Sequence, residues 1–159
     1  PQRAILPLDT GFHMPRSLAK FMRRTPFEVR FDTAFESVIR GCADRAETWI
    51  NPAIREVFIA LHKQGHAHCV EAWQEGKLVG GLYGLALGGA FFAESMYSRV
   101  SNASKVCLVS LVERLRAQGF TLCDVQFHNE HIGQFGVTEI PRDEYRQRLK
   151  DALALPVSF

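Results

Sequence analysis

The chain has 159 residues, of which 47% are hydrophobic and 23% are charged, a balance that is ordinary for a globular domain. This length suffices for one domain with a sizeable hydrophobic core, and the formal net charge of +2 at pH 7 is too small to indicate nucleic-acid binding by itself. The longest apolar run, 78–93, is interrupted by glycines and falls short of the roughly 20 residues that a membrane-spanning helix needs.

The first part of the chain predicts helices around one short strand. Residues 1–14 are expected to be irregular, because they contain prolines and a glycine. The elements that follow are a helix over 15–24, a strand over 27–31, a helix ending near residue 42 and a helix starting at residue 52 and ended by Gly65. Asp32 or Thr33 is expected to cap the second of these helices, and Asn51 the third.

The rest of the chain predicts a meander of strands, a long helix and a mixed ending. The strands of the meander are expected over 68–74, 77–87 and 90–95. Asn102 or Ser101 should cap the long helix, and Gly119 should close it. A strand over 120–126, a helical turn over 128–133, a strand over 137–140 and a helix over 141–153 complete the order. This order predicts an α+β fold of the GNAT acetyltransferase type, with a mixed, largely antiparallel sheet flanked by helices.

Glu94 stands at the end of an apolar strand. Burying a carboxylate costs several kcal/mol unless it is paired or protonated, so this position is either well satisfied or functional. In a coenzyme A-dependent acetyltransferase, the loop after this strand is rich in glycine and binds pyrophosphate. The corresponding loop here, 96–102, has no glycine. The glycines before Glu94 are expected to shape the sheet or to let another backbone approach closely.

Asp124 and Gln126 are expected on one face of a strand, because side chains alternate along it. An acid and an amide side by side can orient and deprotonate an amine. The structural alternative is a satisfied buried pair that links the sheet to a loop.

A cluster of cations lies near the N-terminus. Arg16, Lys20, Arg23 and Arg24 have a spacing that puts them on one helix face. Such a face suits phosphate contacts, or it is simply solvated. Trp49 precedes a helix and is either a stacking platform or a core residue.

Neither the cysteines nor the histidines have the spacing of a metal site. The four cysteines are scattered without a C-x-x-C pair, and we interpret them as reduced core thiols of a cytosolic protein. His62, His66 and His68 lie close in sequence, but no carboxylate or second cysteine completes a ligand set. We therefore expect no metal and no cofactor.

Seven segments of the chain match one known family, in order from about residue 5 to the C-terminus. They are LPLDTGFHMPRSLAKFMRR, TWINPAIREVFIALHKQGHAHCVEAW, LVGGLYGLALGGAFFAESMYSR, NASK, LCDVQ, EIPRDEY and LPVSF. On these segments the chain resembles the leucyl/phenylalanyl-tRNA–protein transferases. Those enzymes attach Leu or Phe from charged tRNA to an N-terminal Arg or Lys of proteins, which marks the proteins for degradation by the N-end rule.

The resemblance implies an acetyltransferase-like fold, an aminoacyl-tRNA as acyl donor and no cofactor, in agreement with the glycine-free loop. By resemblance, Glu94, Asp124 and Gln126 occupy the active-site acid, acid and amide positions. The resemblance also implies that Trp49 contacts the terminal adenosine and that Leu82, Phe91 and nearby apolar residues line the pocket for the donor's Leu or Phe side chain. Met96 and Ser98 are expected to bind substrate as well. The expected contacts with the acceptor-stem phosphates are those of Arg16, Lys20, Arg23 and Arg24.

The resemblance also implies a division of the chain and some departures from the family. Residues 1–30 would connect and carry the basic helix, and residues 31–159 would form the catalytic domain. The family usually carries a further N-terminal segment that helps form the donor site, and this sequence begins where that segment would join. Ala93 stands where the family usually has Gly, and Gln-Phe-Gly at 134–136 replaces a small residue followed by Leu-Gly.

The predicted protein is thus a cytoplasmic transferase that acts as a monomer without contacting a membrane. Two alternatives remain open at this point. One is an N-acyltransferase that uses another donor, such as an acyl-coenzyme A. The other is an inactive, shortened relative that binds peptide or RNA.

Overall fold

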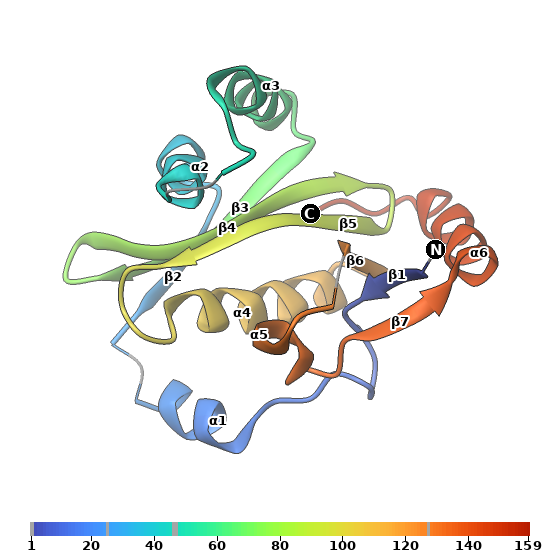
Figure 1. The fold of residues 1–159 in the computed structure, drawn as a ribbon, viewed down its shortest axis with the longest axis horizontal. Coiled ribbons are helices and arrows are strands. Elements are labelled where there is room, and N and C mark those ends of the chain that lie inside the picture. Colours follow the sequence, from blue (N-terminus) through green and yellow to red (C-terminus); the bar gives the residue numbers. More distant parts are fainter. Residues whose placement is uncertain (1, 25, 46–47, 127) are drawn as a thin grey trace. The chain divides into compact units, whose positions relative to one another are not determined.

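The computed structural model describes residues 2–24, 26–45, 48–126 and 128–159. Its elements are β1 Gln2–Ile5, α1 Arg16–Met22, β2 Glu28–Phe31, α2 Phe35–Ala43, α3 Pro52–Lys63, β3 Ala67–Gln74, β4 Lys77–Leu87, β5 Ala90–Ser98, α4 Ala103–Ala117, β6 Leu122–Gln126, α5 Glu130–Gly133, β7 Thr138–Pro141 and α6 Arg142–Leu153 (Figure 1). Within the described residues, hydrogen-bonded pairing orders the strands β2-β3-β4-β5-β6-β1-β7. β5 and β6 run parallel, whereas β2–β3, β3–β4, β6–β1 and β1–β7 are antiparallel. This mixed sheet confirms the predicted α+β class.

Two compact units divide the chain, and neither is one continuous stretch. The first comprises Pro1–Arg23, Ala86–Ala93 and Val112–Phe159, and the second comprises Arg24–Leu85 and Glu94–Leu111. The expected division at residue 30 stays a prediction.

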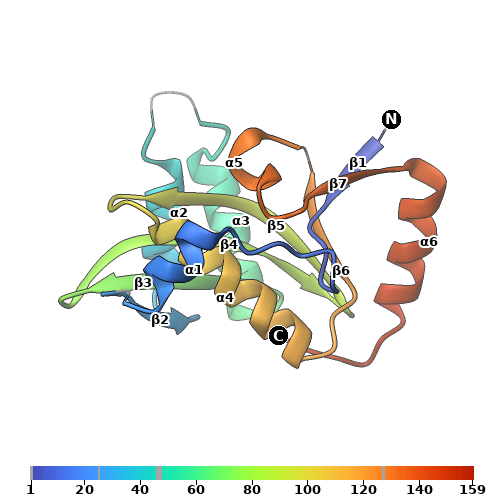
Figure 2. The same cartoon turned by 90° about the horizontal axis from the view of Figure 1, so that it is seen from below.

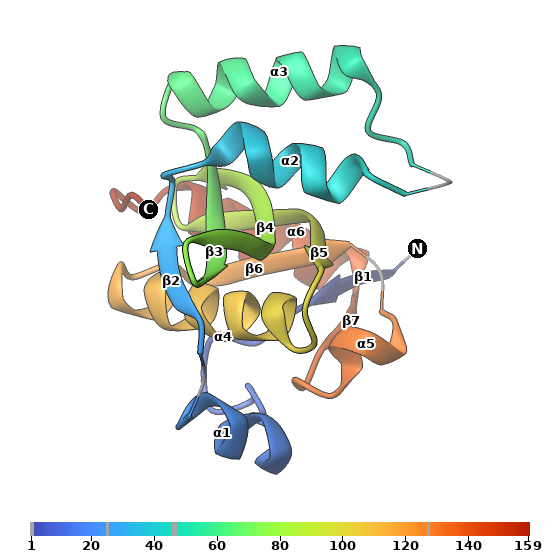
Figure 3. The same cartoon turned by 90° about the vertical axis from the view of Figure 1, so that its left-hand side faces the viewer.

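In the second unit, α2 and α3 pack on each other and on β3, as Figure 3 shows. The core between them is fully buried around Val38, Ile39 and Tyr83. Two glycines of β4 make this packing possible. A Cβ at Gly81 would lie 3.1 Å from the Val38 side chain, and a Cβ at Gly80 would lie 2.5 Å from that of Ala103 at the start of α4. These glycines therefore let helices approach the sheet closely, as the sequence suggested.

In the first unit, β1 lies between β6 and β7, and α6 packs against all three strands (Figure 1). The loop between β1 and α1 is visible in Figure 2. Arg116 anchors this loop, since its guanidinium donates to the carbonyl oxygens of Leu8 and Asp9 at 2.7 and 2.5 Å. Phe12, also in this loop, stacks on Phe135, which lies between α5 and β7, with ring centroids 6.0 Å apart. The start of α1 is thereby fixed within this unit.

The prediction of irregular structure for residues 1–14 is wrong at its beginning, where residues 2–5 form β1. β1 has only four residues, and its partners, Asp124 and Gln126 in β6 and Thr138–Pro141 in β7, come more than a hundred residues later. A run this short carries no clear periodicity of its own, so long-range pairing decides its structure.

Helix capping is partly as predicted. The Asn51 side chain accepts a hydrogen bond from Ile54 N at 2.9 Å, and Pro52 follows it, which confirms the start of α3. Asp32 and Thr33 do not cap α2, whose N-cap is Ala34 without a side-chain bond. Instead, the Glu71 carboxylate accepts from the backbone N–H groups of Thr33 and Ala34 at 2.7 and 2.8 Å.

The start of α4 also differs from the expectation. The expected cap Asn102 has a left-handed backbone with φ 71°. Ser98 Oγ instead accepts the N–H of Ser104 at 2.7 Å. Ser98 is the last residue of β5, which runs three residues beyond its expected end.

Candidate active site

The best-defined constellation of the first unit surrounds Asp124, which is 0% exposed. Its Oδ2 accepts from Arg3 Nε at 2.8 Å and from the Tyr145 hydroxyl at 2.5 Å. Its Oδ1 accepts from the backbone N–H of Gln126 at 2.7 Å. Each carboxylate oxygen is therefore satisfied by a strong donor, and the ion pair with Arg3 offsets the cost of burying the charge.

Three elements bring these groups together. Arg3 comes from β1, Asp124 and Gln126 come from β6, and Tyr145 comes from the first half of α6. The register of β1 on β6 shifts between Ala4, opposite Gln126, and Ile5, opposite Asp124, which leaves one extra residue on β6. Gln126 has φ 69°, in the left-handed region. Such bulges and strained residues re-aim side chains and are common beside active sites.

The charges of this cluster affect its titrating groups. Burial raises the pKa of Tyr145 to about 12, and the hydrogen bond and charge of Asp124 act in the same direction. Burial alone would lower the pKa of Arg3, but Asp124 holds it above its ordinary value. The Tyr145 hydroxyl and the Arg3 guanidinium therefore stay protonated donors toward Asp124 at neutral pH.

The Gln126 side chain is half-buried, and its Nε2 lies 3.5 Å from the carbonyl oxygen of Ala93, at the limit of a hydrogen bond. Asp124 and Gln126 thus lie in one constellation, and their catalytic role stays a prediction. Asp124 also fits the alternative of a satisfied buried group.

Glu94 belongs to the second unit and is half-buried. Burial raises the pKa of Tyr83, and the negative charge of Glu94 contributes to this rise. The Tyr83 hydroxyl is buried and has no hydrogen-bond partner among the described residues. Phe35 and Phe58 pack edge-on against its ring. The Tyr83 hydroxyl is therefore a buried polar group within an apolar surrounding, and the charge of Glu94 acts on it.

The residues predicted to contact the donor lie in different environments. Leu82 and Phe91 are 1% and 0% exposed. The Phe91 ring stacks on that of Phe159 at 5.6 Å between centroids. Met96 is half-buried, and its carbonyl oxygen accepts from Arg45 at 3.0 Å. Trp49, in contrast, is 51% exposed in the loop before α3, which suits a stacking platform better than a core residue.

The four predicted tRNA-binding cations are all exposed. α1 buries Leu18 and carries Arg16 and Lys20, with Arg23 as its C-cap, so its outer surface is basic. Arg24 is the first residue of the other unit.

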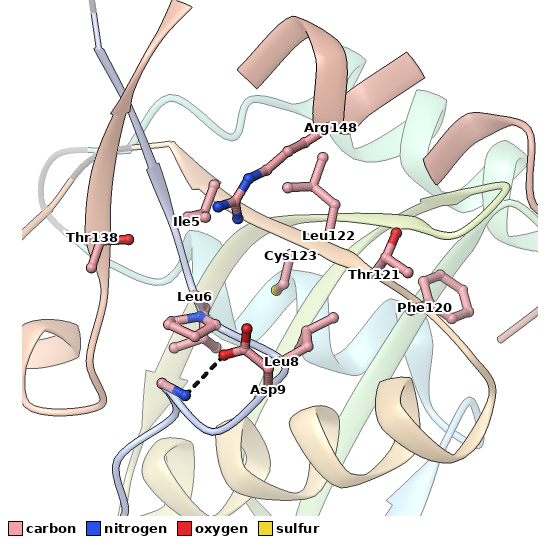
Figure 4. A pocket seen from close by; sticks show the side chains of 12 residues that line it. Ile5, Leu6, Leu8, Asp9, Phe120, Thr121, Leu122, Cys123, Thr138 and Arg148 are labelled. Carbon is pink, nitrogen blue, oxygen red and sulfur yellow. Dashed lines mark hydrogen bonds between the residues drawn. The ribbon is translucent and has the colours of Figure 1, made fainter. Parts of the chain in front are cut away.

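A cavity of about 480 Å³ lies in the first unit (Figure 4). Leu6, Leu122 and Cys123 are among its apolar lining residues, and Arg148 extends into it from α6. Asp9 lines it too, but its Oδ1 already accepts the N–H of Gly11 at 2.8 Å. The lining includes no residue that the sequence analysis predicted to hold the donor side chain.

All four cysteines are free and buried, as predicted. Burial raises the pKa of the Cys42, Cys107 and Cys123 thiols to about 12, so these thiols are unreactive at neutral pH. His68 bonds to Asp32 at 2.7 Å and to the Gly65 carbonyl oxygen at 3.0 Å. Within the described ranges, no group of three metal-ligating side chains converges.

Of the helices that the structure describes, none is both apolar enough and long enough to cross a membrane.

Sequence reasoning missed Arg3, Tyr145 and Glu71. Glu71 is 0% exposed and lies between Val70 and Ala72 in β3. Like Glu94, it is an acid in an apolar strand and could have been expected to be well satisfied or functional. No local signal marked Arg3, because its partner Asp124 lies 121 residues away in the sequence.

Solved structures similar to this one share the fold at low sequence identity. A GNAT family acetyltransferase from Brucella melitensis, in complex with acetyl-CoA, superposes with a TM-score of 0.57 at 13% identity over 73% of this chain and 88% of that one. The C-terminal domain of a putative lysylphosphatidylglycerol synthetase from Agrobacterium fabrum has a TM-score of 0.52 at 12% identity, over 83% of this chain and 48% of that one. These likenesses confirm the acetyltransferase-like fold.

Sequence relatives are much closer. The leucyl/phenylalanyl-tRNA–protein transferase of Gloeobacter violaceus is 57% identical over 99% of this chain and 81% of its own length. That of Salinibacter ruber is 59% identical over 95% of this chain and 66% of its own length. The family model described as leucyl/phenylalanyl-tRNA protein transferase matches residues 5–150. The chain therefore belongs to the leucyl/phenylalanyl-tRNA–protein transferase family.

Proposed function

We propose that this chain transfers Leu or Phe from an aminoacyl-tRNA to the N-terminal Arg or Lys of a protein, which tags that protein for degradation. The observation that carries the proposal is the buried Asp124 beside the left-handed Gln126, in a chain that belongs to this family. An amide held on a fixed backbone next to a satisfied carboxylate is suited to orient an incoming amine.

The transfer reaction depends more on orienting the amine than on activating the ester. The ester that joins the amino acid to tRNA is already reactive, so a neutral amine held in line gains most from correct placement. The amine nitrogen forms a C–N bond with the ester carbonyl carbon, and the C–O bond to the tRNA breaks. The proton that the amine loses passes to the leaving tRNA oxygen, which departs as a hydroxyl group. Gln126 would hold the amine in this step, and Asp124 would hold Gln126 through its backbone N–H.

Glu94 would pair with the cationic side chain of the acceptor's N-terminal residue. Support comes from the half-buried position of Glu94 at the end of the apolar part of β5. A carboxylate that is partly removed from water discriminates a cation from a neutral side chain more strongly than an exposed one.

The aminoacyl-tRNA would be held at its terminal adenosine, its acceptor stem and its amino-acid side chain. The exposed indole of Trp49 would stack on the terminal adenosine, and Arg16, Lys20, Arg23 and Arg24 would contact acceptor-stem phosphates. Leu82, Phe91, Met96 and Ser98 would border the pocket for the donor side chain. An apolar pocket rejects polar side chains well but separates Leu from Phe by only about 1–3 kcal/mol.

An acyl-coenzyme A donor is less well supported. The loop after β5 lacks glycine, and Ser98 Oγ already takes the N–H of Ser104 at the start of α4, which a pyrophosphate would need. The four free thiols fit a reducing compartment, so we place the protein in the cytoplasm.

Incubation with charged tRNA tests the proposal. The chain is mixed with a peptide that begins with Arg and with Leu-tRNA, Phe-tRNA or acetyl-CoA in separate reactions, and products are identified by mass spectrometry. The same set is run with the chain fused to the N-terminal part of the Gloeobacter relative. We expect a peptide extended by one Leu or Phe, and no extension of an N-acetylated control peptide. Absence of extension from both proteins, or acetylation by acetyl-CoA instead, would contradict the proposal.

A further inference from the structure

We propose that Arg3 and Tyr145 are positioning residues for the transfer reaction: they fix the buried Asp124 carboxylate, which in turn fixes the backbone of Gln126. This inference rests on the proposed function. It assigns a role to two residues outside the predicted site, on the first strand and on the last helix of the chain.

Asp124 already accepts hydrogen bonds from three donors. Its side chain is 0% exposed, Oδ2 accepts from Arg3 and Tyr145, and Oδ1 accepts from the Gln126 N–H. A buried carboxylate with an ion pair and two further hydrogen bonds has its orientation fixed by these donors. Asp124 is therefore suited to hold Gln126 in place.

The backbone of Gln126 needs to be held, because φ 69° lies in the left-handed region. A non-glycine residue there is strained and persists only when its surroundings enforce it. The 2.7 Å bond from its N–H to Asp124 Oδ1 supplies this enforcement directly. If the carboxylate turned, the bond would be lost and the amide of Gln126 would aim elsewhere.

Arg3 and Tyr145 restrain the Asp124 carboxylate from turning. They approach the same oxygen from two elements, at 2.8 and 2.5 Å. They also support each other, since the Arg3 guanidinium lies over the Tyr145 ring at 5.6 Å from its centroid. The Arg3 side chain is 40% exposed, so the clamp is a boundary feature and not a buried core contact.

The two members contribute differently. Arg3 supplies the charge that compensates buried Asp124, and its planar guanidinium supplies the stacking, which Lys would not reproduce. Tyr145 supplies one oriented hydrogen bond and no charge. Removing Arg3 should therefore impair the site more than removing the Tyr145 hydroxyl.

The test measures transfer by Arg3→Gln, Arg3→Lys and Tyr145→Phe with Leu-tRNA and an Arg-starting peptide, in the full chain. We expect kcat to fall about 5–10-fold for Tyr145→Phe and about 30–100-fold for Arg3→Gln, with Arg3→Lys in between and KM for both substrates within about twofold. Arg146→Gln, an exposed arginine next to Tyr145 on α6, is the matched control and should leave kcat unchanged.

A second comparison separates positioning from general structural support. If Arg3 and Tyr145 act through Asp124, each substitution should change kcat by less than about twofold in an Asp124→Asn background. Losses that add fully in that background would overturn the inference. So would wild-type kcat in folded Arg3→Gln and Tyr145→Phe, with circular dichroism as the fold check. Absence of transfer by the wild-type chain would instead contradict the proposed function itself.

Discussion

Glu71 and Asp124 are both buried carboxylates, and we assign them different roles. Both carboxylates are 0% exposed, and several hydrogen-bond donors converge on each of them. Asp124 receives Arg3, Tyr145 and a backbone N–H, and it serves the candidate site. Glu71 receives Thr33, Trp73 and the backbone N–H groups ahead of α2. Both acids are buried, and their different partners lead us to propose a structural role for Glu71 and a functional role for Asp124.

Replacing Glu71 by Gln should destabilise the protein by about 2–4 kcal/mol, because an amide NH₂ would face N–H donors in a buried site. Urea unfolding at pH 7 measures the loss. Glu56→Gln, at an exposed position of α3, is the matched control and should change stability by less than about 0.5 kcal/mol.

The same residue predicts a pH dependence. Burial alone would raise the pKa of Glu71, but its hydrogen bonds lower it below the ordinary value of 4.5. The stabilisation from Glu71 is therefore present above pH 4.5 and is lost as the pH falls through the lower, folded-state pKa. The difference in unfolding free energy between wild type and Glu71→Gln should shrink in acid. A difference that grows in acid would contradict this account.

Two elements, β1 and α1, contribute to the proposed function outside the reacting groups. β1 brings Arg3 to Asp124, and the loop that follows it is tied by Arg116 before α1 begins. α1 has seven residues and buries one of them, and its exposed surface is basic. A helix this short owes its stability to its anchoring, because isolated helices of this length are marginal in water.

Replacing Lys20 and Arg23 together by Ala should weaken tRNA binding and flatten its salt dependence. If each cation meets one phosphate, the slope of log K against log salt should lose about 1–2. A fluorescence titration at several salt concentrations measures this slope. The double variant Arg146→Ala, Lys150→Ala removes the same charge from α6. An equal change of slope in both double variants would show a net-charge effect and refute the α1 contact.

For the whole molecule, local patterns in the sequence were enough to predict most elements. Asn51-Pro52 marked the start of α3, and the glycine turns between strands located β3, β4 and β5. They could not predict β1, the Glu71 cap or the Arg3–Asp124 pair, because each depends on a partner far away in the sequence. Asp124 and Gln126 were found from their spacing and the family resemblance, but the left-handed backbone of Gln126 has no signal in the sequence.

The central claim is that Gln126, held by Asp124, orients the acceptor amine. Single-turnover transfer from Leu-tRNA to an Arg-starting peptide tests it most directly, with wild type, Gln126→Ala and Asp124→Asn compared at equal tRNA occupancy. We predict that both substitutions slow the chemical step by about 100-fold or more while tRNA affinity stays within about threefold. Near-wild-type transfer rates in both folded variants would contradict the account.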